Sequence, residues 1–184
     1  MSEDEKPASA REEILAVDDT PANLRLLSEL LTKHGYCVRP ASDGALALKS
    51  VAARTPDLIL LDVMMPEMDG FETCRRLKAA EQWRQIPVIF LTAKTETADL
   101  VQGFGLGAVD YVAKPFNAHE LLARVNTHLT MDELRRSLAD KNVELARAHE
   151  LVRRAFGRYV SEEVATSILQ SPEGLELGGE EREV

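Results

Sequence analysis

The chain has 184 residues, 45% of them apolar, which is enough for one domain of ordinary size with an appendage and excludes two full-sized catalytic domains. Its 22 Lys and Arg stand against 31 Asp and Glu, a net charge of −9, so we expect no nucleic-acid partner. The longest apolar stretch, at 58–65, is far shorter than the roughly 20 residues that cross a bilayer, so we expect no membrane association. Two cysteines, Cys37 and Cys74, and no signal-peptide pattern favour a cytoplasmic setting.

Residues 1–10 are polar and small, which predicts a disordered tail. From there to about residue 129, continuous apolar runs that predict buried strands alternate with stretches of helical periodicity. The apolar runs are strong at 14–17, 58–63 and 88–93 and weaker at 37–41 and 109–113. The predicted helices lie at 24–31, 45–53, 71–79, 99–105 and from 117 onward.

This alternation predicts an α/β fold with a doubly wound, five-stranded parallel sheet, right-handed crossovers and helices on both faces. The strands of such a sheet end at one common edge, and functional groups lie beyond their carboxyl ends. The side chains that follow the predicted strands are therefore the candidates for a functional site.

Three carboxylates stand at predicted strand ends, with Asp18 and Asp19 after the first strand and Asp62 at the end of the third. At one edge of a sheet these groups repel one another unless a cation neutralises them. Carboxylate oxygens suit Mg²⁺, which we expect as the cofactor. A helix cap ahead of Thr20 and Pro21 is the alternative for Asp18, but it explains one carboxylate and not two.

The two remaining strands bring complementary groups to the same edge. Thr92 ends the fourth predicted strand and is followed by the small Ala93, while Lys114 and Pro115 follow the fifth. A hydroxyl and an ammonium group thus face the carboxylates. Taken singly, Thr92 is an ordinary strand residue and Lys114 an ordinary surface lysine, so their significance depends on the combination.

Four segments carry this combination in order: AVDD (16–19), LLDVMMPEMDG (60–70), VIFLTA (88–93) and YVAKPF (111–116). Together they resemble the receiver domain of two-component response regulators over residues 11–129. The resemblance implies the flavodoxin-like receiver fold and a cis peptide bond between Lys114 and Pro115. Within this pattern, Asp69 and Gly70 are interpreted as a turn and a helix cap without chemistry.

The resemblance also implies the chemistry of the site. Asp62 would be the phosphorylation site, taking a phosphoryl group from a histidine kinase or a phosphotransfer protein. Mg²⁺ would be held by Asp19, Asp62 and the backbone carbonyl of Met64, with Asp18 acting through a bound water.

Three further groups would serve the phosphorylated state. Lys114 would pair with one phosphoryl oxygen, and the Thr92 hydroxyl would donate to another. Thr92 and Tyr111 would form the switch, because the Tyr111 ring would change orientation on phosphorylation and alter the neighbouring surface.

The last predicted helix has no stop signal at the domain edge, so we expect it to run on as a coiled-coil signalling helix over 130–156 that forms a parallel homodimer. Leu138, Leu145 and Val152 recur every seven residues, and two seams can be drawn through them. The first seam adds Leu134, Lys141, Ala148 and Ala155, and the second adds Arg135, Asn142, His149 and Phe156. Neither seam is cleanly apolar, so a solvated single helix is the alternative.

The sequence FGRYVSEEVATSILQSPEGLELGGEEREV (156–184) resembles the segment that precedes the catalytic domain of bacterial class III nucleotide cyclases. We therefore expect 157–184 to be a partly mobile entry segment, and the output to be an adenylate or guanylate cyclase, more specifically an adenylate cyclase, whose catalytic core is missing from this chain. The alternatives are a stand-alone receiver that docks onto another protein and the receiver of a diguanylate cyclase. A DNA-binding output is disfavoured, because 171–184 hold five glutamates and a single arginine.

Overall fold

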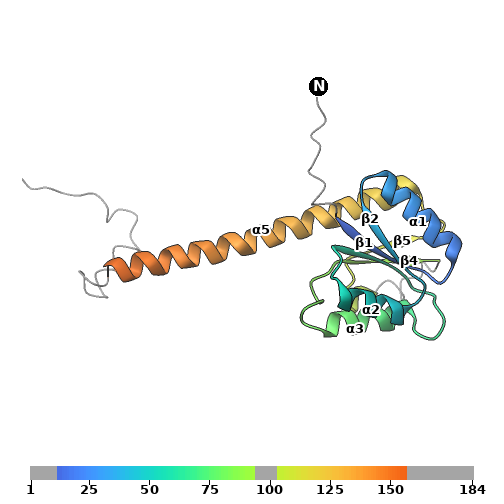
Figure 1. Ribbon diagram of the computed structural model, residues 1–184, viewed down its shortest axis with the longest axis horizontal. Helices are drawn as coiled ribbons and strands as arrows, with labels where there is room; N and C mark the ends of the chain where they lie inside the picture. The colour runs from blue at the N-terminus through green and yellow to red at the C-terminus, as the bar shows by residue number, and fades with distance from the viewer. Residues whose placement is uncertain (1–11, 94–102, 157–184) are drawn as a thin grey trace, which may run out of the picture. The chain divides into compact units, whose positions relative to one another are not determined.

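A computed structural model of the chain describes residues 12–93 and 103–156 (Figure 1). Five parallel strands form one sheet in the order β2-β1-β3-β4-β5. The strands are β1 (Glu13–Val17), β2 (Cys37–Ala41), β3 (Leu58–Asp62), β4 (Val88–Thr92) and β5 (Asp110–Ala113). The helices are α1 (Pro21–Lys33), α2 (Gly44–Ala53), α3 (Gly70–Ala79) and α5 (Ala118–Phe156). The predicted doubly wound parallel sheet is confirmed.

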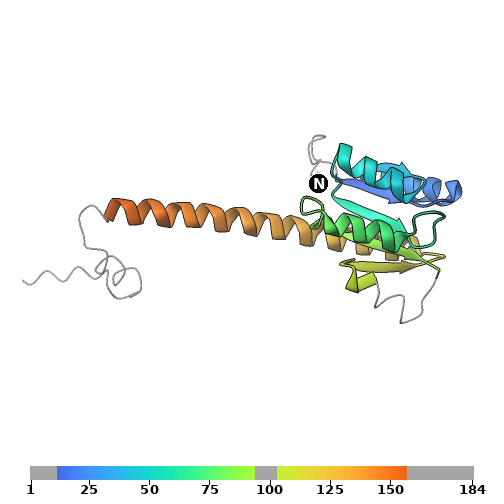
Figure 2. The same cartoon turned by 90° about the horizontal axis from the view of Figure 1, so that it is seen from below.

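The central strands β1, β3 and β4 are buried at every position, which explains why their sequences read as continuous apolar runs. Alternate side chains of these strands enter two separate cores. Helices α2 and α3 cover one face of the sheet, while α1 and the first part of α5 cover the other (Figures 1 and 2). The layers leave the carboxyl edge of the strands open for a site.

The helices begin where the sequence provides caps. Asp43 and Asp69 accept hydrogen bonds from the backbone amides of Leu46 and Glu72, each at 2.7 Å, at the starts of α2 and α3. The interpretation of Asp69 as a cap is therefore confirmed. Helix α1 begins with Pro21 in its first turn, a position where the missing amide proton costs no hydrogen bond.

Helix α5 continues without a break to Phe156, as the lack of a stop signal predicts. Its first turns pack on the sheet through Leu121, Val125 and Leu129, which are buried and four residues apart. Contacts within the chain divide it after Glu133 into two units, so the later part of α5 belongs to a unit separate from the sheet. No helix in residues 12–93 and 103–156 is long and apolar enough to span a membrane.

Three predicted segments lie wholly or largely outside the described residues. These are the tail at 1–10, residues 99–102 of the helix predicted at 99–105, and the entry segment at 157–184. The predicted domain boundaries remain predictions.

Candidate functional site

Two of the predicted carboxylates meet because β1 and β3 are parallel neighbours. Val17 pairs with Leu61, so the next residues, Asp18 and Asp62, lie side by side at the carboxyl edge of the sheet. Asp18 is fully buried and Asp62 is 3% exposed, whereas Asp19 is exposed. All three offer carboxylate oxygens within 4.8 Å of one another. This part of the predicted site is assembled as the strand ends indicate.

Lys114 follows β5 and reaches across to both buried carboxylates. Its Nζ lies 2.6 Å from Asp18 Oδ2 and 2.8 Å from Asp62 Oδ2. The backbone amide of Lys114 donates to the carbonyl oxygen of Thr92 at 2.7 Å, and the peptide bond to Pro115 is cis, as expected. One ammonium group thus compensates part of the negative charge of two buried carboxylates.

The electrostatics of Asp62 and Lys114 reflect burial and their mutual contact. Burial raises the pKa of the Asp62 carboxyl, and the negative charge of Asp18 adds to this rise, while the Lys114 ammonium opposes it without cancelling it. Burial alone would lower the pKa of Lys114, but its hydrogen bonds to Asp18 and Asp62 outweigh burial and raise it. Lys114 is therefore a stable cation beside the carboxylates.

The loop after β3 approaches Asp62 through its backbone. The Met64 amide donates to Asp62 Oδ1 at 3.3 Å, and the Gly70 amide donates to the Val63 carbonyl oxygen at 3.0 Å. A Cβ atom added to Gly70 would lie 2.2 Å from the Asp62 carbonyl oxygen and 2.8 Å from Val63 Cα. Only glycine allows this close approach, so Gly70 shapes the loop although it carries no chemistry.

Thr92 and Tyr111 lie on the two strands beyond β3. Thr92 ends β4 at 3% exposure and pairs with Ala113 of β5. The Tyr111 ring lies edge-on to Phe104, with ring centroids 6.1 Å apart, and the Arg124 guanidinium carbon lies 5.8 Å from its centroid. The structure thus brings Thr92 to the edge that holds the carboxylates, and the switch role of Thr92 and Tyr111 remains a prediction.

Sequence reasoning missed Asn23 and a cluster around Asp110. Asn23 donates to Asp18, and Arg124 donates to both carboxylate oxygens of Asp110, which His128 also contacts at 3.1 Å. The only available signal for Asn23 was a polar residue in the first turn of a helix that begins next to the carboxylates. The Asp110 cluster depends on how α5 packs against β5 and leaves no local signal.

The side chains at this edge fit a hard divalent cation. Carboxylate oxygens from three residues, one exposed and two buried, form the kind of oxygen donor set that Mg²⁺ takes in proteins. Receiver domains of response regulators bind Mg²⁺ at an acidic pocket of this kind. The donor chemistry of Asp18, Asp19 and Asp62 therefore supports the expected cofactor.

The family model of the response regulator receiver domain matches residues 14–126. This chain belongs to that family. The receiver of this chain is 48% identical over 126 residues to the response regulator PleD of Caulobacter vibrioides, covering 66% of this chain and 28% of PleD. It is 44% identical over 123 residues to the DNA-binding response regulator MtrA of Mycolicibacterium smegmatis, covering 67% of this chain and 53% of MtrA.

Proteins described by other functions also match the receiver of this chain. A probable cyclic di-GMP phosphodiesterase of Vibrio cholerae is 43% identical over 129 residues, covering 70% of this chain and 29% of that protein. Among solved structures, the chemotaxis protein CheY4 of Vibrio cholerae matches with a TM-score of 0.62 and 34% identity, covering 64% of this chain and 98% of CheY4. The chain spans roughly a quarter to two thirds of the length of the curated relatives that it matches.

Proposed function

We propose that this receiver accepts a phosphoryl group on Asp62 from a histidine kinase or a phosphotransfer protein. The observation that carries the proposal is the position of the Asp62 carboxylate, 3% exposed, beside Asp18 and 2.8 Å from the Lys114 ammonium group. A nearly buried carboxylate with a cation at hydrogen-bond distance is a costly arrangement for a merely structural residue. Receiver domains are phosphorylated by histidine kinases, which is in accord with this assignment.

In the proposed step, an Asp62 carboxylate oxygen attacks the phosphorus atom of a phosphohistidine. The P–N bond breaks, its electron pair stays on the imidazole of the donor, and an acyl phosphate remains on Asp62. Lys114 and the Thr92 hydroxyl donate hydrogen bonds to the transferred oxygens. When bound at Asp19, Asp62 and the Met64 carbonyl, with Asp18 acting through a water, Mg²⁺ supplies positive charge for the phosphoryl group.

Incubation with acetyl phosphate and Mg²⁺, followed by intact mass measurement, tests this assignment. One phosphoryl group should appear on the wild-type chain and none on Asp62→Asn. Asp69→Asn is the matched control, because asparagine caps α3 as well as aspartate does and should leave labelling unchanged. Labelling of Asp62→Asn equal to that of the wild type would place the phosphoryl group elsewhere.

The change at Asp62 is proposed to reach α5 through Thr92 and Tyr111. Thr92 follows Leu91, the β4 residue that pairs with Asp62. The Tyr111 ring contacts Phe104, which precedes β5, and Arg124, which lies on α5. A reoriented Tyr111 ring therefore alters contacts on two elements at once. We propose that the ring takes a second orientation in the phosphorylated chain, through which the local change of charge at Asp62 would act at a distance.

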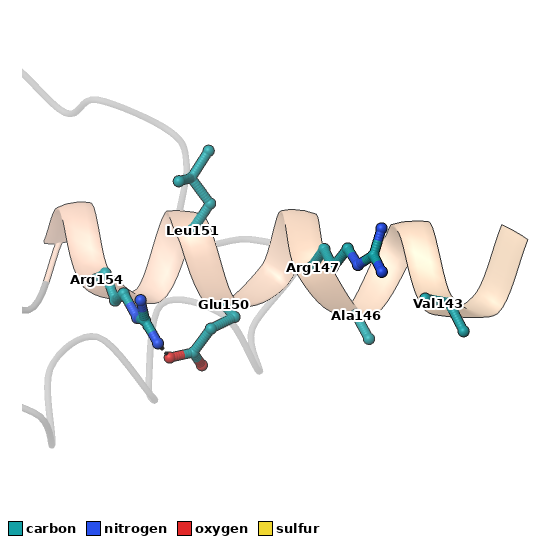
Figure 3. Close-up of a pocket in the computed structure, with 6 residues that line it drawn as sticks. All are labelled: Val143, Ala146, Arg147, Glu150, Leu151 and Arg154. Atoms are coloured by element: carbon teal, nitrogen blue, oxygen red, sulfur yellow. Dashed lines mark hydrogen bonds and ion pairs between the residues drawn. The ribbon is translucent and has the colours of Figure 1, made fainter. Parts of the chain in front are cut away.

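The later part of α5, within the proposed signalling helix at 130–156, is proposed to form a parallel homodimeric coiled coil. Leu138, Leu145 and Val152 recur every seven residues and are 62%, 61% and 40% exposed. About half a turn from this stripe, Glu150 and Arg154 point the same way and form an ion pair at 2.9 Å, although the exposed Val143 lies on that side as well (Figure 3). In a coiled coil, an exposed apolar stripe at heptad spacing is buried against a partner helix, and a second copy of the chain offers the same stripe.

The output is proposed to be a class III nucleotide cyclase, more specifically an adenylate cyclase, that follows the entry segment at 157–184. The support is the likeness of residues 156–184 to the segment ahead of such catalytic domains, whose active sites form between two copies. A parallel dimer of α5 would deliver two entry segments side by side. DNA-binding relatives share the receiver, yet the acidic residues 171–184 do not favour a DNA-binding output.

A second candidate output is an enzyme of cyclic di-GMP metabolism, such as a diguanylate cyclase. The observation in its favour is the 43% identity to the probable cyclic di-GMP phosphodiesterase of Vibrio cholerae. Sequencing the gene beyond the codon of Val184 and assaying the full-length product separates the candidates. Cyclic AMP from ATP supports the first, formation or hydrolysis of cyclic di-GMP supports the second, and no nucleotide chemistry with a complete gene favours a stand-alone receiver.

A further inference from the structure

The most constrained side chain of the site is Asp18, whose two oxygens accept four hydrogen bonds. Oδ1 accepts from the Thr20 amide at 2.9 Å and from Asn23 Nδ2 at 3.0 Å. Oδ2 accepts from Asn23 Nδ2 at 3.0 Å and from Lys114 Nζ at 2.6 Å. A fully buried carboxylate is stable only when its acceptor positions are filled in this way.

Asn23 supplies two of these four hydrogen bonds from the first turn of α1. The turn is fixed by its own backbone, because the Thr20 carbonyl oxygen accepts from the Asn23 amide at 3.0 Å. Among the described residues, the Asn23 side chain donates to Asp18 alone, and it is only half-buried. The Asn23 side chain therefore serves mainly to hydrogen-bond Asp18 and adds little to the packing of the core.

Lys114 differs from Asn23 because it is shared between Asp18 and Asp62. In the proposed function, Lys114 turns toward a phosphoryl oxygen and gives up part of its contact with Asp18. The hydrogen bonds from Thr20 and Asn23 do not involve Asp62, so they persist when the lysine moves. The orientation of the Asp18 carboxylate then depends on the hydrogen bonds from the Thr20 amide and from the Asn23 side chain.

We propose that Asn23 is a positioning residue that holds the Asp18 carboxylate in the orientation the Mg²⁺ site needs. The proposal rests on the proposed function, since it assumes that Mg²⁺ binds at the three carboxylates. Residues that orient the groups around a metal site without touching the ion commonly change metal affinity by about 10–100-fold when they are replaced. Without the amide donor, the buried Asp18 carboxylate turns toward other donors and toward Lys114.

Titration of the metal-free chain with MgCl₂, followed by NMR of backbone amides, tests the proposal. The Thr20 amide is the reporter, because it donates to Asp18 Oδ1 and its chemical shift follows the orientation of that carboxylate. In Asn23→Ala we expect a shifted Thr20 resonance before metal is added and a dissociation constant for Mg²⁺ roughly tenfold higher. Asn23→Gln keeps an amide donor on a longer side chain and should recover part of the affinity.

Asn117→Ala is the matched control for a loss of stability. Asn117 caps the start of α5, where its side-chain oxygen accepts from the His119 amide at 2.8 Å rather than serving Asp18. Its replacement should lower stability but leave Mg²⁺ affinity within about twofold of the wild type, well below the effect expected at Asn23. Wild-type affinity in Asn23→Ala, or an equal loss in Asn117→Ala, overturns the role of Asn23. A wild-type chain that binds no Mg²⁺ would instead overturn the proposed function.

Discussion

Lys114 Nζ lies 2.8 Å from Asp62 Oδ2 although Asp62 ends β3 and Lys114 follows β5, with β4 between these two strands. The lysine side chain reaches across the end of β4 from the residue that directly follows β5. The contact joins the nucleophile of the proposed reaction to the group that would hold its product. It also makes Lys114 the main compensation for the charge of Asp18 and Asp62 in the metal-free chain.

Replacing Lys114 should therefore make stability depend on Mg²⁺. Lys114→Met leaves two buried carboxylates without their cation, and we expect a loss of about 3 kcal/mol in the free energy of unfolding when EDTA is present. Millimolar Mg²⁺ should recover much of this loss, because the ion binds the folded carboxylates. Urea unfolding with and without Mg²⁺ measures both effects.

Lys49→Met is the matched control for the previous variant, because Lys49 is exposed on α2 and away from the carboxylates. It should change stability by less than about 0.5 kcal/mol in either buffer. If Lys114→Met is as stable as Lys49→Met in EDTA, the ion pairs at Asp18 and Asp62 carry no stabilising role.

Gly70 should not tolerate a methyl group. In Gly70→Ala the new Cβ meets backbone atoms of Asp62 and Val63, which cannot move aside as a flexible side chain does. We expect a loss of roughly 1–3 kcal/mol in the free energy of unfolding and slower phosphorylation by acetyl phosphate. Gly105→Ala is the control, since nothing lies within 4 Å of its added Cβ, and it should be neutral or stabilising. Equal effects of the two substitutions would contradict the close approach at Gly70.

The sequence predicts the site well where function depends on strand ends and poorly where it depends on packing. Asp18, Asp62 and Lys114 meet because each stands at or just after the end of a parallel strand, and the sequence indicates these strands, strongly for β1 and β3 and more weakly for β5. Asn23 escapes such reasoning because its contact with Asp18 depends on how α1 leaves the first strand. The contact between Arg124 and Asp110 escapes it because nothing local in either segment indicates that α5 crosses β5 at that point.

Asp110 provides a pH-dependent test of that packing. Burial raises the pKa of the Asp110 carboxyl, but the Arg124 guanidinium, the Tyr111 amide and His128 together lower it below its usual value. A carboxyl whose pKa is lowered in the folded state stabilises that state at pH values above its usual pKa. This contribution is lost as the pH falls through the lowered pKa. Asp110→Asn should therefore be less stable than the wild type at neutral pH.

The difference between Asp110→Asn and the wild type should shrink as the pH falls below about 4, where Asp110 begins to be protonated in the unfolded chain. Urea midpoints of both proteins between about pH 7 and pH 3 measure this gap directly. Asp140→Asn, at an exposed position of α5, serves as the control and should follow the wild type. A gap at Asp110 that is the same at every pH would show that the charge of the carboxylate does not matter.

The apolar stripe of α5 should control the oligomeric state. Leu145→Lys places a charge in the stripe and should convert a dimer to a monomer in sedimentation velocity at micromolar concentration. Val143→Lys is the matched control: Val143 is 51% exposed and apolar, but it lies about half a turn from Leu145, on the side of Glu150. That variant should remain dimeric.

The register of the dimer can be read from disulfide trapping, because in a parallel coiled coil a core residue lies close to the same residue of the other copy, whereas a residue on the outer face does not. Single cysteines at Lys141 and at Asn142, introduced into a Cys37→Ser background that removes the exposed native thiol, report the first and the second seam respectively. Polar residues interrupt both seams, Lys141 in the first and Arg135, Asn142 and His149 in the second, so neither register is cleanly favoured and a modest change in the receivers can shift the balance. Acetyl phosphate with Mg²⁺ should therefore change the ratio of cross-linking at the two positions. A wild-type monomer, or cross-links that indicate an antiparallel pair, would contradict the proposed dimer, and an unchanged ratio would show that phosphorylation does not act through the register.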